Sequence, residues 1–530
     1  MSDAPAAAAR RSDAVRDLLA RHRPAVLAGA VAACLAVAYL LAPLTGLDLA
    51  AQIARADFAG DHPLTPVDFR WFGGNLTFGY SLWTPQVMAL VGVRLTGATC
   101  SVVATVQTTV LFGRTGAKRP TAGGVLAALA QTVNLVVGRF TFSLGMICGL
   151  GALLVLTSAA RPVRMPALLR VAVLALLAGA ASPVAALYLW ICAGALVLVG
   201  RWRCGCTLLV ASALPVLVIS GVFGDGGNQP YAGHDFRDAL IATLVVLLVV
   251  PLDRAVLRVG AGIGLIMVVA AYVADTPVGS NASRLSQLFA VPIVAAYVAW
   301  RPWLAAAAVI AAGYPQQVVV HNWFTFGPSA APAYYEPLIE QVRARGPLTG
   351  RVEIPDTKAH WEAAFLARAV PLARGWIRQV DVGLNETVFY DGPPTPATYR
   401  SWLAANSVQY VAVPDVALST AGVNEVDTID EHPSFLQPVW QDAHWRLFAV
   451  VAPVPIVGAP GRLVSVDAAG ITLDAPVVST VEINARWFRW LSLAGPDGCI
   501  EQSPDGHVRL VATAAGAYRL TSSLVPAGHC

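Results

Sequence analysis

The stretch PAVLAGAVAACLAVAYLLAPL, residues 24–44, contains no charged side chain. Its length of about 20 residues is what an α-helix needs to cross the hydrocarbon core of a bilayer. A cleaved signal peptide would have a shorter apolar core, of about 7–15 residues, and a small-residue cleavage site after it. The residues that precede it, 1–23, are polar and rich in Ala and Arg. We therefore interpret residues 24–44 as a retained first transmembrane helix.

Further apolar runs follow this first one along the chain. They lie near residues 96–113, 121–138, 141–159, 167–182, 184–200, 205–222, 238–252, 257–274, 285–300 and 302–319. Only 13% of the whole chain is charged, whereas an ordinary soluble protein has about 25% charged residues. The sequence predicts a polytopic α-helical membrane core over 24–320, with about eleven transmembrane helices.

The net charge of +4 is small, and the chain has no basic stripe interleaved with aromatic residues. These features exclude nucleic acid as an expected partner.

Basic residues are distributed unevenly between the two alternating sets of connections. The positive-inside rule places the connections rich in Lys and Arg on the cytoplasmic side. One set holds fifteen: Arg10, Arg11, Arg16, Arg21, Arg23, Arg114, Lys118, Arg119, Arg161, Arg164, Arg201, Arg203, Arg254, Arg258 and Arg301. The other holds five: Arg55, Arg70, Arg139, Arg237 and Arg284. We expect a multi-pass protein of the plasma membrane, with residues 1–23 in the cytoplasm and residues after about 320 outside it.

The composition after His321 changes to that of a soluble region. Residues 333–346 and 396–406 have the pattern of amphipathic helices, and VQYVAVP after the second has that of a buried strand. We expect an extracytoplasmic α/β domain over 321–450. From about 450, short alternating runs separated by Gly, Pro and Asp predict an antiparallel β-sandwich over 451–530. In it, the segment STVEINARWFRWLSL (479–493) is expected to contain one strand across Arg486 and Trp487.

Cys499 and Cys530 are the two cysteines of this C-terminal region. A pair in an oxidising compartment can form a disulfide. The sequence leaves this open, because Cys530 is the last residue.

The first outer loop, about 45–90, carries the strongest local signal for chemistry. It contains four carboxylates, Asp48, Asp57, Asp61 and Asp68, among several aromatic residues. A carboxylate at the membrane surface could deprotonate an acceptor hydroxyl or bind a metal ion, and Arg55 or Arg70 could bind a phosphate. The alternative is a solvated loop anchored by an aromatic belt.

Arg139 and Arg284 lie at the outer ends of apolar runs. Charges at this depth are costly and often functional, although snorkelling to the interface is the alternative. No phosphate-binding loop, dinucleotide fingerprint, zincin motif or nucleophile elbow is present.

Several segments together support a family resemblance. They are DLAAQIARADF (48–58), PVDFRWFGG with FGYSL (66–82), SPVAALYL (182–189), SRLSQLFAVP (283–292) and, further on, GRVEIP, HWEA, PLARGWIRQVD, YRSWL, VQYVAVPD and PVWQDAHWRLFAV. On these the chain resembles, over nearly all of its length, the actinobacterial membrane proteins related to GT-C glycosyltransferases. Members are often labelled as membrane proteins related to 6-pyruvoyl-tetrahydropterin synthase, a label that implies no pterin chemistry here.

The resemblance implies an activity and a set of residues. GT-C enzymes transfer a sugar from a polyprenyl-phosphate donor to an acceptor on the outer face, and their first outer loop carries an essential acidic residue. Asp48 is closest to that position, and Asp57 is the second candidate. The expected substrate- and phosphate-binding residues are Arg55, Asp68, Arg70, Arg139, Arg237 and Arg284.

The expected partners are a polyprenyl-phosphate-linked sugar, an envelope glycan or lipid acceptor, and membrane lipid. The loop lacks an adjacent acidic pair, so we assign no metal ligand and leave a divalent metal requirement open. Two alternatives remain. One is a transporter or flippase of lipid-linked material, for which repeated halves and charges deep within helices would be typical. The other is a non-catalytic scaffold that binds envelope glycan.

Overall fold

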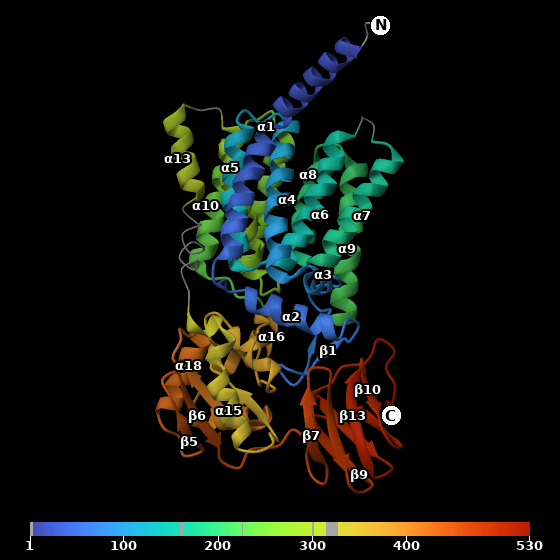
Figure 1. Ribbon diagram of the computed structural model, residues 1–530, viewed down its shortest axis with the longest axis vertical. Coiled ribbons are helices and arrows are strands. Elements are labelled where there is room, and N and C mark those ends of the chain that lie inside the picture. The colour runs from blue at the N-terminus through green and yellow to red at the C-terminus, as the bar shows by residue number, and fades with distance from the viewer. Residues whose placement is uncertain (1–3, 160–162, 225, 299–300, 314–326) are drawn as a thin grey trace.

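The computed structural model describes residues 4–159, 163–224, 226–298, 301–313 and 327–530, with side chains described from residue 22 onward. Helices dominate the chain to residue 313, and strands are concentrated in its C-terminal region. Figure 1 shows a bundle of long helices with the N-terminus at one end and the strand-rich region against the other. We call these the N-terminal end and the domain end of the bundle.

The helices of the bundle run back and forth between its two ends. They are α1 (Ala4–Leu41), α4 (Val93–Arg114), α5 (Pro120–Val137), α6 (Phe140–Ser158), α7 (Met165–Ala181), α8 (Pro183–Leu198), α9 (Trp202–Phe223), α10 (Gly233–Val249), α11 (Ala255–Val273), α12 (Arg284–Tyr297) and α13 (Pro302–Gly313).

Among the described residues, six helices are long and apolar enough to cross a membrane: α1 from His22, α4, α5, α6, α9 and α11. Helices α7, α8 and α13 are shorter apolar helices. The protein is therefore membrane-embedded, while the expected number of eleven crossings remains a prediction.

Small residues allow the bundle helices to pack closely. Ala28 and Ala32 of α1 are fully buried, and a Cβ on Gly124 of α5 would lie 2.9 Å from the Cβ of Ala28. Close approach of this kind is how membrane helices associate without a hydrophobic driving force. Large apolar side chains such as Leu217 and Ile266, each 69% exposed, lie instead on the surface that a bilayer would cover.

The segment between α1 and α4 crosses the domain end of the bundle (Figure 1). It contains α2 (Leu49–Asp61), a short hairpin of β1 (Val67–Asp68) and β2 (Asn75–Leu76), and α3 (Thr84–Val91). Phe69 and Trp71 between the hairpin strands are each 1% exposed. A Cβ on Gly375 would lie 2.3 Å from Trp71, so the C-terminal region packs directly on this segment.

The first part of the C-terminal region combines short helices with a mixed sheet. Its helical elements are η3 (Pro328–Ala330), η4 (Pro332–Tyr334), α15 (Glu336–Ala344), η5 (Trp361–Ala363), η6 (Leu366–Arg368), α16 (Arg378–Asn385), η7 (Glu386–Tyr390), α17 (Pro396–Ala405) and α18 (Thr420–Asp430). The strands are β3 (Arg351–Glu353), β4 (Val408–Pro414), β5 (Leu436–Gln441) and β6 (Trp445–Val450), in the order β3-β4-β6-β5. Strands β3 and β4 are parallel, and the other pairs are antiparallel.

The second part has two antiparallel sheets around one apolar core. The sheets have the orders β10-β13-β8-β7 and β11-β12-β9, and their facing residues include Leu473, Ile483, Leu510 and Tyr518, all fully buried. The strands are β7 (Arg462–Asp467), β8 (Gly470–Ala475), β9 (Ser479–Arg486), β10 (Leu491–Ala494), β11 (Gly498–Gln502), β12 (His507–Ala512) and β13 (Gly516–Ser522). A disulfide joins Cys499 of β11 to Cys530.

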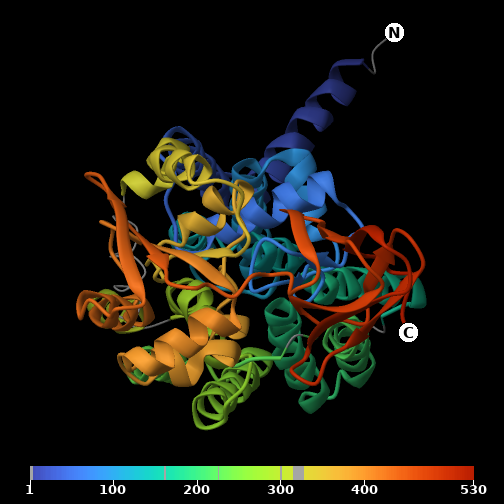
Figure 2. The ribbon, with the colours of Figure 1, turned by 90° about the horizontal axis from the view of Figure 1, so that it is seen from below.

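The expectation of one strand across Arg486 and Trp487 is wrong. Strand β9 ends at Arg486, and a turn over 487–490 leads into β10 in the other sheet. The turn is used for docking: the ring of Trp490 stacks on Phe223 at the end of α9, with centroids 5.2 Å apart. Figure 2 shows the two parts of the C-terminal region side by side across the domain end, with the sandwich in red.

Candidate functional site

Asp48 stands where the chain leaves α1 and begins α2. Its backbone N–H donates to the carbonyl of Val137, at 2.9 Å, so the start of α2 lies against the end of α5. Two glycines permit this approach: a Cβ on Gly46 would lie 2.2 Å from Val136 O, and one on Gly138 would lie 2.6 Å from Leu49 N. Both have positive φ, 117° and 89°, which glycine adopts without a steric penalty.

Two arginines from distant parts of the sequence face the carboxylate of Asp48. Arg139 Nε lies 3.4 Å from Asp48 Oδ2, and an Nη of Arg284 lies 3.9 Å from the same oxygen. Arg139 also donates to Gln287 Oε1, at 3.0 Å. We call Asp48, Arg139, Arg284 and Gln287 the Asp48 cluster. The side chain of Asp48 is 27% exposed, so solvent or a ligand can reach it.

The Asp48 cluster has an excess of positive charge. Two guanidinium groups share one carboxylate, and the buried Nε of Arg139 makes no hydrogen bond to any described residue. Guanidinium groups bind phosphate and carboxylate oxygens with several directed donors. The cluster therefore has the excess of positive charge that an anionic ligand requires.

An apolar cavity of about 730 Å³ lies inside the bundle, and none of the four residues of the Asp48 cluster lines it. Phe142, Tyr188 and Leu285 line its domain end, and the guanidinium of Arg284 lies 5.7 Å from the ring centroid of Phe142. From there the cavity continues between α4, α6, α8 and α12 to Arg114, Arg201 and Arg254. Its domain end therefore adjoins the Asp48 cluster, and its charged lining residues lie at the N-terminal end.

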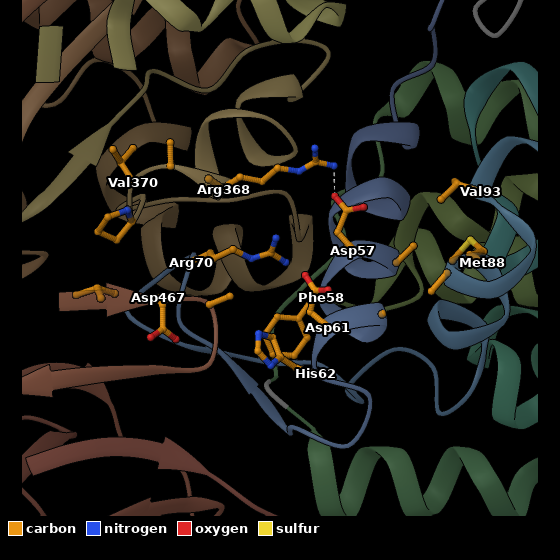
Figure 3. A pocket seen from close by; sticks show the side chains of 18 of the residues that line it. Asp57, Phe58, Asp61, His62, Arg70, Met88, Val93, Arg368, Val370 and Asp467 are labelled. Atoms are coloured by element: carbon orange, nitrogen blue, oxygen red, sulfur yellow. Dashed lines mark hydrogen bonds and ion pairs between the residues drawn. The ribbon is translucent and has the colours of Figure 1, made fainter. Parts of the chain in front are cut away.

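A second cavity, of about 820 Å³, opens outside the bundle and is drawn in Figure 3. We call it the cleft. Asp57, Asp61 and His62 of the α2 segment lie on one side, with Arg368 and Val370 across from them and Asp467 of β7 below. Asp57 and Arg368 form an ion pair across it. The cleft is polar and open, as a site for a hydrophilic ligand would be.

The two candidate bases are not brought together. Asp48 and Asp57 are nine residues apart on one helix, a separation of about 14 Å along its axis. Asp57 faces Arg368 in the cleft, whereas Asp48 faces Arg139 and Arg284.

Four other predicted binding residues are occupied by neighbours within the fold. Arg70 binds Asp68 through both carboxylate oxygens and donates to Ala54 O at 2.8 Å, which ties the hairpin to α2. Arg55 donates to Thr77 O and lies over the ring of Tyr80. Arg237 pairs with Asp238 at 2.9 Å and is largely exposed. Arg70 alone of these residues also lines the cleft.

Sequence reasoning missed residues in both the Asp48 cluster and the cleft. Gln287 lies one turn after Arg284 on α12, so its helical spacing could have indicated it. Arg368 and Asp467 approach the cleft from 311 and 410 residues beyond Asp57 in sequence number, and no local pattern indicates them. No family model matches the chain, and no curated protein shows detectable similarity to it.

Proposed function

We propose that the protein is a GT-C-like membrane glycosyltransferase of cell-envelope assembly, which uses a polyprenyl-phosphate sugar as donor. The observation that carries the proposal is the Asp48 cluster, which adjoins the domain end of the apolar cavity through Phe142. A polyprenyl-phosphate has a charged head at the membrane surface and an apolar tail in the bilayer. Arg139 and Arg284 suit the head, and the neighbouring cavity, which Phe142 lines beside Arg284, suits part of the tail.

The chemistry assigned to the cluster is a direct displacement at the anomeric carbon. The acceptor oxygen forms a bond to that carbon while the bond to the phosphate oxygen breaks. Asp48 takes the proton of the acceptor hydroxyl as general base. Arg139 and Arg284 stabilise the negative charge that develops on the departing phosphate.

The cleft is the proposed binding site for the acceptor. Asp57, Asp61, His62 and Arg368 offer hydrogen-bond donors and acceptors to sugar hydroxyls. An acceptor glycan held there would extend along α2 to reach Asp48, about 14 Å away along the helix. We assign these residues to acceptor binding and not to the chemical step.

The flippase alternative has one observation in its favour, which is that the apolar cavity reaches the N-terminal end. The arginines there are already engaged, however. Arg254 donates to Thr115 O and Gly116 O, at 2.6 and 3.0 Å, and Arg114 donates to Leu154 O at 3.1 Å. Cations that satisfy the carbonyls at helix ends stabilise those ends. At the domain end, Arg139 and Arg284 share the single carboxylate of Asp48, and this excess of positive charge favours transfer there over passage through the bundle.

The test is sugar transfer in proteoliposomes from a labelled polyprenyl-phosphate donor. Asp48→Asn keeps the shape and removes the base, so it should lower the rate by about 10² to 10⁴ while donor binding persists. Arg284→Gln should chiefly weaken donor binding. Asp505→Asn, in an exposed turn of the sandwich, is the control.

Full activity of Asp48→Asn would show that another residue is the base. Movement of donor across the bilayer by the wild type, without transfer, would favour the flippase alternative.

A further inference from the structure

Three side chains of different chemistry converge in the C-terminal region, between β3 and η5. They are Asp356, His360 and Glu362, which are 8%, 2% and 6% exposed. His360 Nδ1 lies 2.8 Å from Asp356 Oδ1 and 3.9 Å from Glu362 Oε1. One ring nitrogen of His360 and one carboxylate oxygen from each of Asp356 and Glu362 lie within 4.8 Å of one another.

Neighbouring groups hold each of the three in this orientation. Ser419 Oγ donates to Asp356 Oδ2 at 2.5 Å, and Thr357 Oγ1 donates to Glu362 Oε2 at 2.8 Å. These hydroxyls bind Asp356 Oδ2 and Glu362 Oε2. The other oxygen of each carboxylate, Asp356 Oδ1 and Glu362 Oε1, is the one that faces His360. Outer hydroxyls that orient ligating carboxylates are typical of metal sites.

His360 itself is held in an uncommon conformation. Its backbone has φ of 56°, a left-handed conformation that few non-glycine residues adopt. The ring of His360 stacks on Trp376 with centroids 3.4 Å apart. The backbone N–H of His360 donates to Thr357 Oγ1 at 2.8 Å. Backbone strain of this kind persists where the surrounding structure fixes a functional side chain.

The buried surroundings of the three residues hold more carboxylates than arginines, which is a second observation. Among the described residues, the arginines that pair with the local carboxylates are Arg374 and Arg378. The carboxylates are five: Glu353, Asp356, Glu362, Asp381 and Glu425. Glu353 is fully buried and lies 3.8 Å from an Nη of Arg374, the same arginine that pairs with Asp381 and Glu425. Buried charges are normally paired or bound to a metal.

We propose that Asp356, His360 and Glu362 bind a divalent transition metal ion, with Zn²⁺ as the best fit. Zn²⁺ binds histidine nitrogen and carboxylate oxygen at about 2.0–2.2 Å, in tetrahedral geometry. Ligand atoms around such an ion are about 3.4 Å apart, between the 2.8 and 3.9 Å that separate His360 Nδ1 from the two carboxylate oxygens. A mixed imidazole and carboxylate set suits Zn²⁺ better than Mg²⁺ or Ca²⁺, which prefer oxygen ligands alone.

The ion would reinforce one wall of the cleft. The segment that carries His360 and Glu362 continues through η6 to residues 367–371, which line the cleft. The metal site is separate from the Asp48 cluster, and its existence does not depend on the proposed transferase activity.

The experiment measures Zn²⁺ binding to the purified full-length protein in detergent micelles, after removal of metal by a chelator. Titration calorimetry should give one equivalent for the wild type, and Zn²⁺ should raise the Tm. Glu362→Gln and His360→Asn should each reduce affinity by at least about 10-fold and abolish the Tm shift. Asparagine tolerates the left-handed backbone, so His360→Asn retains the fold where alanine would add strain.

The matched control is a second His–Asp pair in the same region. His444 Nδ1 lies 2.8 Å from Asp415 Oδ2, and both side chains are more than 40% exposed. His444→Asn should leave Zn²⁺ binding unchanged. Cobalt substitution adds a spectroscopic test, since the wild type should give a d–d absorption that Glu362→Gln alters.

The alternative is a protonated His360 that bridges two carboxylates without any metal. Less than 0.1 equivalent of Zn²⁺ bound by a folded wild type at micromolar concentration would overturn the proposal. Unchanged binding by both folded ligand variants would also overturn it.

Discussion

Buried carboxylates make the stability of the C-terminal region depend on pH. Burial, with Glu425 as neighbour, holds the pKa of Glu353 well above its usual range, and burial raises the pKa of Glu425 to about 7. In the unfolded chain both groups lose their protons near about pH 4.3. The folded state therefore keeps protons that the unfolded state has lost, and stability falls as pH rises above about 4.3 and through 7.

We expect Glu353→Gln to remove part of this loss. Because the amide carries no charge to desolvate, the Tm at pH 8 should rise by about 2–4 °C, with little change at pH 4.5, where the wild-type carboxyl is already protonated. Thermal unfolding at the two pH values measures both effects. Glu431→Gln, at an exposed site, is the control, and an equal gain at both pH values would contradict the charge argument.

Some single residues of the site follow from the sequence, and others do not. Asp48, Arg139 and Arg284 follow from the sequence because each lies next to the outer end of an apolar run. The structure places both guanidinium groups within 4 Å of Asp48 Oδ2. Asp68 and Arg70 had similar signals, yet their spacing of two residues lets them satisfy each other. Asp356, His360 and Glu362 lie in an irregular segment, where spacing carries no periodic signal.

At the scale of elements, the fit of α2 against the turn between α5 and α6 determines the geometry of the Asp48 cluster. Gly138 is the residue that permits this fit. Alanine in the left-handed conformation costs about 1–2 kcal/mol, and its Cβ would also lie 2.6 Å from Leu49 N. The change should therefore separate Asp48 from Arg139.

We expect Gly138→Ala to lower sugar transfer by about 100-fold, the cost typical of a misplacement of 1 Å, and to lower the Tm. Gly200→Ala is the matched control, because Gly200 has φ of 81° but nothing within 4 Å of an added Cβ. Gly200→Ala therefore introduces the cost of the left-handed backbone without a steric clash, and it should leave sugar transfer unchanged. Equal effects of the two variants on transfer would show that the contact with α2 is unimportant.

Elements with strong periodicity were predicted best. The helix followed by a strand was confirmed as α17 (Pro396–Ala405) and β4 (Val408–Pro414), because the apolar periods 3.6 and 2 are local properties. The prediction of one strand over 479–493 is wrong because the alternation of residue types continues through a turn. At this turn, Arg489 and Trp490 donate to Val222 O, a tertiary contact that no local pattern records.

At the scale of the whole molecule, the C-terminal region and the first loop form one structure at the domain end. Leu372 N donates to Arg70 O, and Phe69 N donates to Ala468 O, at 2.8 and 3.0 Å. The loop is thus bound to both parts of the C-terminal region. A ligand in the cleft contacts all three, so the region beyond 327 belongs to the proposed acceptor site and is more than an appended domain.

The side of the membrane on which this structure lies is the last prediction. The sequence places fifteen basic residues in the cytoplasmic connections and five in the outer ones. The structure adds one to each set: Arg170 lies near the start of α7 at the N-terminal end, and Arg94 near the start of α4 at the domain end. The asymmetry persists, and the disulfide between Cys499 and Cys530 agrees with an oxidising compartment.

We expect alkaline phosphatase, which is active only outside the cytoplasm, to be active when fused after Cys530 and inactive when fused after Arg201. A cytoplasmic reporter at the same positions should give the opposite result. Activity of the cytoplasmic reporter after Cys530 would place the cleft and the Asp48 cluster inside, where a donor on the outer leaflet could not reach them.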